Sequence, residues 1–511
     1  MVTPSKKMAA SLAEIQKLQA AGRRVFRSNE LGRIHRQRLV AQGFLLEVMK
    51  GWLISSSPSA AAGDSTPWYA SFWEFCAAYC HERFGDEWHL SPEQSLLLHA
   101  ENTVIPKQVI VYAPKGSNNT LRLLFDTSIF DLGEKQPRSK ADLTIREGLR
   151  LFTPAAALTR VPEAFFARNP VEAQVALAAI RDASDVLARL LEGGHSVVAG
   201  RLAGAFRHIG RDNIADEILS AMKAAHYDVR ETNPFTPAQS FGRIATGVAP
   251  IVARMRLMWE SARKPALKLF PKPPGLPANP DQYLSFIDGI YTSDAYHSLS
   301  IEGYRVTPEL IERVRSGAWD PDNHDADRQS RDALAARGYW QAFQLVKRSV
   351  AAIIAGENPG TLVRSAHRDW YRELFRPCVA AGLISASAFA GYRNDAVYLR
   401  NSRHVPPRWE AVRDAMPELF DLLEQESEPA ARAVLGHWFF GYIHPYSDGN
   451  GRMARFLMNA MLASGGYPWT VIRVEDRDTY LRALESASVD MDVAPFATFV
   501  AQRVEWSMAQ A

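Results

Sequence analysis

Residues 444–455 read His-Pro-Tyr-Ser-Asp-Gly-Asn-Gly-Arg-Met-Ala-Arg, and this stretch decides the fold of the C-terminal part of the chain. Apolar residues recur at helical spacing on both sides of it. They are Leu435, Trp438, Phe439 and Tyr442 before the stretch, and Met453, Phe456, Leu457, Ala460 and Met461 after it. The pattern predicts two buried helices joined by a loop. Gly449 and Gly451 let that loop turn tightly and pass close to a ligand.

The residue types in this loop point to phosphate chemistry. The loop opens a new helix, whose free amides and positive dipole end favour an anion. Arg452 and Arg455 are three residues apart, near one helix face, and two guanidinium groups there suit a triphosphate. Asp448 beside them is a natural ligand for Mg²⁺, which takes phosphate oxygens and water as its other ligands. His444 can reach the same point, and histidine is the usual general base for a hydroxyl nucleophile.

The whole string resembles the signature of the Fic family, His-x-Phe-x-Asp/Glu-Gly-Asn-Gly-Arg-x-x-Arg. Tyr446 stands where phenylalanine is usual, and the resemblance extends over residues 287–500. It implies a mainly α core that transfers AMP from Mg-ATP to a Ser, Thr or Tyr hydroxyl of a target protein. By this resemblance His444 is the base and Asp448 the Mg²⁺ ligand. The implied phosphate-binding residues are Gly449, Asn450, Gly451, Arg452 and Arg455.

Residues 298–303 read Ser-Leu-Ser-Ile-Glu-Gly and resemble the Fic inhibitory motif, Ser/Thr-x-x-x-Glu-Gly/Asn. Ser298 and Glu302 are four residues apart and share a helix face, and Gly303 closes the motif. The resemblance implies an inhibitory helix over 292–304 whose glutamate pairs with Arg455 and removes the partner of the γ-phosphate. In some relatives the same glutamate supports AMP removal, so a deAMPylase is an alternative. An ordinary solvated helix glutamate is another.

A second segment of the expected Fic domain resembles the family's flap, a β-hairpin that aligns the target segment by strand addition. Its residues are Tyr398, Leu399, Arg400, Asn401, Ser402, Arg403 and His404. The resemblance implies that they dock the target protein.

The N-terminal part carries the positive charge of the chain. Residues 1–54 contain ten Lys or Arg and three Asp or Glu, a net +7, whereas the whole chain has a net charge of +3. Helical and hairpin patterns predict a winged helix-turn-helix over 1–56. Its basic helix places Arg33, Arg36 and Arg38 as candidate DNA contacts. A solvated basic helix in a protein-binding module is the alternative.

Residues 57–262 predict a mixed α+β and helical region, with strands at 105–112 and 121–125 paired around a turn. The stretch 11–235 resembles AbiEi-type antitoxin and regulator proteins. That resemblance rests on the winged-helix pattern, on LSPEQSLLLH at 90–99 and on LLEGGHSVVAGRLAGAFRHIGRD at 190–212. It implies DNA binding, autoregulation or restraint of a nucleotidyl-transferring enzyme. Six prolines and three lysines within 263–280 predict a semi-rigid linker to a Fic domain over 281–505.

Bulk properties set the remaining expectations. A chain of 511 residues is too long for one core, so two or three domains are expected. Three cysteines suggest a reducing compartment, and no signal peptide or membrane-length apolar stretch is visible, so a cytoplasmic protein with no membrane partner is expected. A homodimer is compatible with the basic N-terminal part. The competing hypotheses are a DNA-binding regulator that uses the Fic core as a nucleotide sensor, and a fused toxin–antitoxin-like module.

Overall fold

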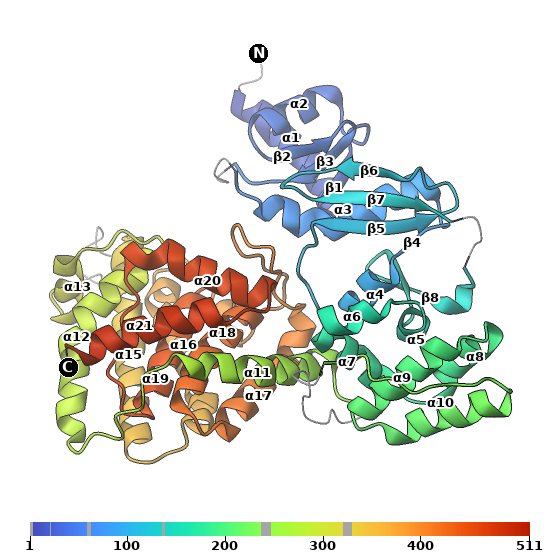
Figure 1. The fold of residues 1–511 in the computed structure, drawn as a ribbon. Coiled ribbons are helices and arrows are strands. Elements are labelled where there is room, and N and C mark those ends of the chain that lie inside the picture. Colours follow the sequence, from blue (N-terminus) through green and yellow to red (C-terminus); the bar gives the residue numbers. More distant parts are fainter. Residues whose placement is uncertain are drawn as a thin grey trace. The chain divides into compact units, whose positions relative to one another are not determined.

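The computed structural model describes residues 4–20, 22–58, 63–134, 138–236, 247–319 and 330–510. The chain forms two compact units, whose elements are labelled in Figure 1. Unit 1 comprises Met1–Pro250 and Tyr398–Val405, and unit 2 comprises Ile251–Val397 and Pro406–Ala511. None of the helices in the described ranges is long and apolar enough to cross a membrane.

Unit 1 begins with two helices packed on a small sheet. The elements are α1 (Pro4–Gln19), β1 (Val25–Arg27), α2 (Arg33–Ala41), β2 (Leu45–Met49) and β3 (Trp52–Ser55), and the sheet order is β1-β3-β2. The two helices and the hairpin lie close to their predicted residues. Strand β1 was not predicted, because three residues are too few to show an alternating pattern. Phe26 on β1 and Leu39 on α2 are fully buried in the core that joins these elements.

A four-stranded sheet follows, packed with the long helix α3. The elements are α3 (Thr66–Phe84), β4 (His89–Leu90), α4 (Pro92–His99), β5 (Gln108–Ala113), β6 (Asn119–Arg122) and β7 (Ser128–Gly133). The predicted pairing of the strands at 105–112 and 121–125 is wrong, since the sheet order is β4-β5-β7-β6. Strand β7 lies between them, antiparallel to β6 and parallel to β5. The connections β5–β6 and β6–β7 have the same length, so loop length alone does not distinguish the two pairings. Cys76 and Cys80 are buried in α3 as small apolar residues.

The rest of unit 1 is mostly helical. Its elements are η1 (Lys140–Asp142), β8 (Leu143–Arg146), β9 (Leu149–Phe152), α5 (Pro154–Leu158), α6 (Glu163–Arg168), α7 (Pro170–Ala179), α8 (Ser184–Glu192), α9 (Ser196–His208) and α10 (Asp212–Ala224). Strands β8 and β9 form an antiparallel pair. The helices share one apolar core, which includes Phe166, Leu202 and Phe206.

Unit 2 is helical, so the prediction of a mainly α fold is confirmed for this part of the chain. Its elements are α11 (Pro250–Lys268), α12 (Pro280–Ile301), α13 (Pro308–Arg315), α15 (Arg331–Ile354), α16 (Pro359–Ala380), η3 (Ala386–Ala390), α17 (Trp409–Gln425), α18 (Pro429–Ile443), α19 (Asn450–Ala463), η4 (Val474–Asp476), α20 (Arg477–Val489) and α21 (Ala494–Met508). Helices α18 and α19 pack together, and α15 packs against α12, α16 and α19. All nine apolar residues predicted to be buried on α18 and α19 are buried.

The predicted linker over 263–280 is wrong in its first part. Helix α11 continues through Pro265 to Lys268, and α12 begins at Pro280. A proline inside a helix costs about 3 kcal/mol. Here α11 buries an apolar face that includes Met258, Trp259 and Ala266, which offsets that cost. The contact boundary between the units accordingly lies at Pro250, before the predicted linker.

The predicted β-hairpin of the flap is also absent from the structure. Residues 398–405 contain no strand and instead make a turn in which Ser402 N donates to Leu399 O at 3.3 Å. Within unit 1, Ile105 N donates to Arg403 O at 2.9 Å. Asn401 has a φ of 56°, which bends the chain away from an extended strand.

Candidate active site

The loop between α18 and α19 contains two left-handed residues. His444 caps the end of α18 with a φ of 51°, and its amide still donates to Phe440 O at 3.0 Å. Gly449 caps the start of α19 with a φ of 80°. A Cβ atom at Gly449 would lie 2.7 Å from the Phe375 ring, so only glycine fits there. A strained non-glycine residue such as His444 persists only where its surroundings hold it in place.

Side chains within the loop fix its shape. Asn450 accepts a hydrogen bond from Tyr446 N at 2.9 Å and donates one to Tyr446 O at 2.8 Å. The Tyr446 ring stacks on Tyr371 with centroids 3.7 Å apart and planes at 6°. Tyr446 therefore anchors the loop through its ring. Its buried hydroxyl has no hydrogen-bond partner among the described residues. Both hydrogen bonds of the Asn450 side chain are made to Tyr446 within the loop, so only the Asn450 backbone amide is available at the start of α19.

Arg393, which is not part of this loop, holds His444 in place. Its buried guanidinium donates through Nε to His444 O at 2.8 Å, and its amide donates to Pro445 O at 2.9 Å. Burial lowers the pKa of His444 to about 4, and the nearby Arg393 charge acts in the same direction. The imidazole is therefore neutral at pH 7 and can accept a proton. Sequence reasoning missed Arg393, because nothing near it in the chain points to the loop.

Arg452 lies between two aromatic rings at the start of α19. Its guanidinium carbon is 5.2 Å from the Tyr304 ring centroid and 5.0 Å from that of Phe375. The side chain is 1% exposed, and Nε and Nη2 have no hydrogen-bond partner among the described residues. A buried cation without hydrogen bonds is costly, and an anion bound at the helix start would satisfy it. The sequence did not indicate Tyr304 or Phe375.

Arg455 pairs with the predicted inhibitory motif through Nε and Nη2, whereas its buried Nη1 has no hydrogen-bond partner among the described residues. It is 3% exposed and donates to Ser298 Oγ at 2.9 Å, to Ser298 O at 3.0 Å and to Glu302 Oε1 at 2.7 Å. Ser298 lies in α12, Glu302 caps the end of that helix, and Gly303 turns the chain with a φ of 85°. Burial opposes ionisation of Glu302, but the charges of Arg455 and Arg452 outweigh it and lower its pKa. The pair is therefore charged at neutral pH.

The Glu302 carboxylate also lies against the start of α19. A Cβ atom at Gly451 would be 2.2 Å from Glu302 Oε1, so the carboxylate touches the second residue of the helix. Helix starts attract anions through their free amides and dipole. A side-chain anion therefore lies at the place where the sequence predicts phosphate binding.

Asp448 has the chemistry of a one-carboxylate metal ligand. Its side chain is 59% exposed, Oδ1 accepts from Gly449 N at 2.6 Å, and Oδ2 is 3.6 Å from Arg452 Nη2. No group of three or more His, Cys, Asp or Glu that could hold a metal occurs among the residues that the structure describes. A lone exposed carboxylate beside an anion site fits Mg²⁺, which keeps several waters and binds through one or two carboxylates plus phosphate.

The other predicted site residues lie in unit 1. Arg33 is exposed on α2, whereas Arg36 donates to Ser28 O at 2.7 Å and Arg38 donates to Lys7 O at 2.6 Å. Arg38 also donates to Ser11 Oγ at 2.6 Å. Two of the three candidate DNA contacts, Arg36 and Arg38, therefore donate hydrogen bonds within the N-terminal segment itself. The flap residues 398–404 belong to unit 1 by their contacts.

Comparison with known proteins places the loop within a family. Residues 361–462 match the profile of the Fic/DOC family. A stretch of 118 residues is 42% identical to protein adenylyltransferase Fic of Nematostella vectensis, covering 22% of this chain and 27% of that protein. A stretch of 120 residues is 34% identical to protein adenylyltransferase fic-1 of Caenorhabditis elegans, covering 23% of each protein.

One solved structure of Fic-1 from C. elegans aligns with 18% identity and a TM-score of 0.37, covering 63% of this chain and 91% of that structure. The chain spans about a quarter of the length of the curated relatives that it matches.

Proposed function

We propose that this chain transfers AMP from ATP to a hydroxyl group of a target protein, and that Glu302 restrains the reaction within the same chain. One observation carries the proposal. The Glu302 carboxylate lies on Arg455 and against Gly451, where an anion is expected at the start of α19. An enzyme whose phosphate site is closed by its own carboxylate needs that carboxylate to move before the triphosphate binds productively.

The reaction proposed is an in-line displacement. The target hydroxyl oxygen attacks the α-phosphorus and loses its proton to the neutral imidazole of His444. The bond from the α-phosphorus to the bridging oxygen breaks, and pyrophosphate leaves. Arg452 and Arg455 stabilise the negative charge on the β and γ phosphates, and the amides at Gly449–Gly451 bind the remaining oxygens. His444 is held by Arg393, which keeps the base in one position as the proton moves.

Asp448 would hold Mg²⁺ in this scheme. When bound, the ion neutralises phosphate charge and orients the triphosphate. The support for it is the exposed Asp448 carboxylate next to the start of α19.

The direct test measures the transfer of label from ATP to protein. Wild type, Glu302→Gly and His444→Ala are incubated with Mg²⁺ and α-labelled ATP in cell lysate, and protein-bound label is measured. We expect strong labelling with Glu302→Gly and none with His444→Ala. ATP labelled at the γ position separates AMP transfer from phosphorylation. Absence of protein-bound α label in every variant, with ATP binding intact, would contradict the proposal.

A second proposed function is DNA binding by residues 1–54. It is supported by the net +7 of this segment and by the arrangement of α2 beside the β2–β3 hairpin. The internal bonds of Arg36 and Arg38 leave Arg33 as the most accessible of the three. Fluorescence anisotropy with duplex DNA tests it. Binding should weaken steeply as salt rises, because cation release dominates such complexes, and Arg33→Ala should weaken it further. Salt-independent or absent binding would exclude this function.

A further inference from the structure

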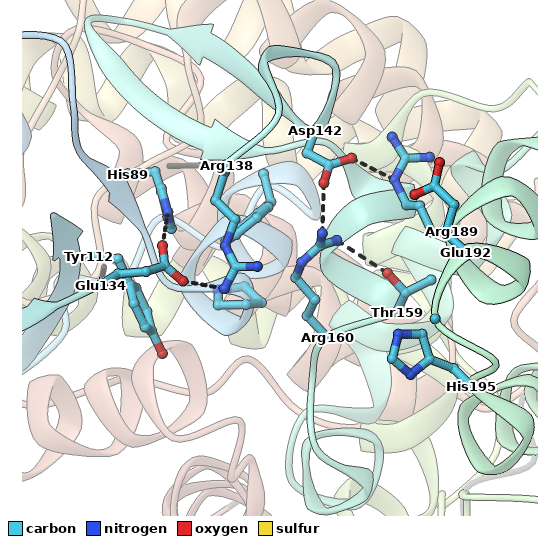
Figure 2. A pocket seen from close by; sticks show the side chains of 13 residues that line it. His89, Tyr112, Glu134, Arg138, Asp142, Thr159, Arg160, Arg189, Glu192 and His195 are labelled. Carbon is cyan, nitrogen blue, oxygen red and sulfur yellow. Dashed lines mark hydrogen bonds and ion pairs between the residues drawn. The ribbon is translucent and has the colours of Figure 1, made fainter. Parts of the chain in front are cut away.

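A pocket of about 520 Å³ lies inside unit 1 (Figure 2). Residues from β4, β5, β9, η1, the end of α5 and the end of α8 line it. Its volume falls in the range of small-ligand sites, roughly 300 to 1,000 Å³. Part of this lining lies in the stretches that resemble regulator proteins: Pro92 in 90–99, and Glu192, Gly193 and His195 in 190–212.

Three arginines line this pocket, and one carboxylate serves two of them. Asp142 Oδ2 is 2.6 Å from Arg160 Nη2, and Asp142 Oδ1 is 2.7 Å from Arg189 Nε. Arg138 pairs with Glu134, which lies beside it. Figure 2 shows Arg138 and Arg160 extending into the same space from different parts of the chain. The carboxylates therefore hold the guanidinium groups in position.

Two of these arginines share a single carboxylate. The pocket lining contains three guanidinium groups and three carboxylates, those of Glu134, Asp142 and Glu192. His89 bonds to Glu134 at 3.0 Å, but burial lowers the pKa of His89, so the ring is neutral at pH 7. Arg138 and Glu192 are both exposed, where water screens their charges. Within the pocket, Arg160 and Arg189 both pair with Asp142, so a bound anion would complete the charge balance next to them.

Donor groups remain available to such an anion. Among the described residues, Arg138 makes one side-chain hydrogen bond, to Glu134. Arg160 donates to Ala156 O at 2.8 Å, to Thr159 Oγ1 at 3.4 Å and to Asp142, which leaves part of its five-donor fork unused. Planar guanidinium forks bind phosphate through paired hydrogen bonds.

One wall of the pocket is aromatic. The Tyr112 ring stacks on His89 with centroids 5.4 Å apart and planes at 14°, and Phe152 meets His89 edge-on at 4.6 Å. Arg160 lies over the Phe152 ring at 5.2 Å. Phe152 is 1% exposed, whereas Tyr112 is only partly buried, so Tyr112 is the ring that a ligand can reach. An aromatic ring next to guanidinium groups suits a ligand that has an organic part at one end and an anion at the other.

We infer that this pocket binds a small phosphate monoester. The phosphate contacts Arg138 and Arg160, and the organic part lies along Tyr112. A nucleoside monophosphate and a sugar phosphate share this chemistry. The inference is independent of AMP transfer, because the pocket is lined only by residues of unit 1.

Hydrogen–deuterium exchange of the full chain tests the inference, with AMP and ribose 5-phosphate as separate probes. We expect slower exchange in peptides covering 138–146 and 186–195. Peptides covering 444–458 report nucleotide bound at the Fic/DOC domain, so the two sites are separated in one experiment. Protection by AMP alone identifies a nucleotide site. Protection by both probes identifies a site for which the sugar phosphate suffices.

The variants Arg138→Gln and Arg160→Gln should each weaken this protection about tenfold or more, since each removes charged hydrogen bonds. Arg168→Gln is the matched control, because Arg168 is exposed on α6 and does not line the pocket. Arg138 is 37% exposed, so its variant stays informative even if Arg160→Gln fails to fold. Absence of protection with both probes, or protection unchanged in Arg138→Gln, would overturn the inference.

Discussion

The contact between Glu302 and Arg455 predicts how strongly the chain restrains itself. The Glu302→Gly change removes the carboxylate from Arg455 and from the start of α19. Ser298 still accepts a hydrogen bond from Arg455 Nε at 2.9 Å, so the guanidinium stays in place. The freed Arg455 nitrogen can then bind a phosphate oxygen. We therefore expect faster AMP transfer without loss of the phosphate site.

The size of the effect follows from the lost interaction. A hydrogen bond between charged groups contributes about 1.5–3 kcal/mol. Glu302 is 30% exposed, so the lower part of that range applies, about 1.5–2 kcal/mol. With about 1.4 kcal/mol for each factor of ten, the rate should rise about 10- to 30-fold.

The assay measures protein-bound label from α-labelled ATP at saturating ATP, with equal amounts of each variant. Glu302→Gln should rise less than Glu302→Gly, because the amide oxygen still accepts a bond but carries no charge. Glu309→Gln is the control, since Glu309 is exposed at the start of α13 and should leave the rate unchanged. An unchanged or lower rate in Glu302→Gly, with ATP binding intact, would refute the inhibitory role.

Three further predictions concern the loop. Burial lowers the pKa of His444 to about 4, so protonation impairs the base only at acid pH. The kcat/KM of Glu302→Gly should therefore stay constant from pH 8 to pH 6. A loss of kcat/KM centred near pH 6.5 would contradict this prediction. Tyr446→Phe removes a buried hydroxyl without a partner, so the free energy of unfolding in denaturant should rise by about 1 kcal/mol, whereas a fall would show an unrecognised partner. Asp448→Ala should abolish most AMP transfer and the dependence of transfer on Mg²⁺. The free energy of unfolding should stay within about 0.5 kcal/mol of wild type, because the side chain is exposed. Transfer with an unchanged Mg²⁺ dependence would exclude Asp448 as the ligand.

The sequence alone determined the helix–loop–helix and its chemistry. Apolar spacing identified the buried faces of α18 and α19, because a helix brings residues three and four apart onto one side. The turn was marked by Gly449, Asn450 and Gly451, because the conformation of a loop depends on the residues within that loop. In these segments the information is local, and the sequence prediction agreed with the structure.

The tertiary structure decided what surrounds the loop. The resemblance implied that Glu302 pairs with Arg455, and the packing of α12 near α19 brings these residues, 153 positions apart, to 2.7 Å. Tyr304 and Phe375 enclose Arg452, and β7 separates the two strands that the sequence had paired. Such contacts depend on how distant elements pack, and packing depends on the shape of whole faces rather than on neighbours in the chain. Local pattern therefore specified the buried helix faces and the turn, whereas long-range packing specified the partners and the charge state of the residues in the loop.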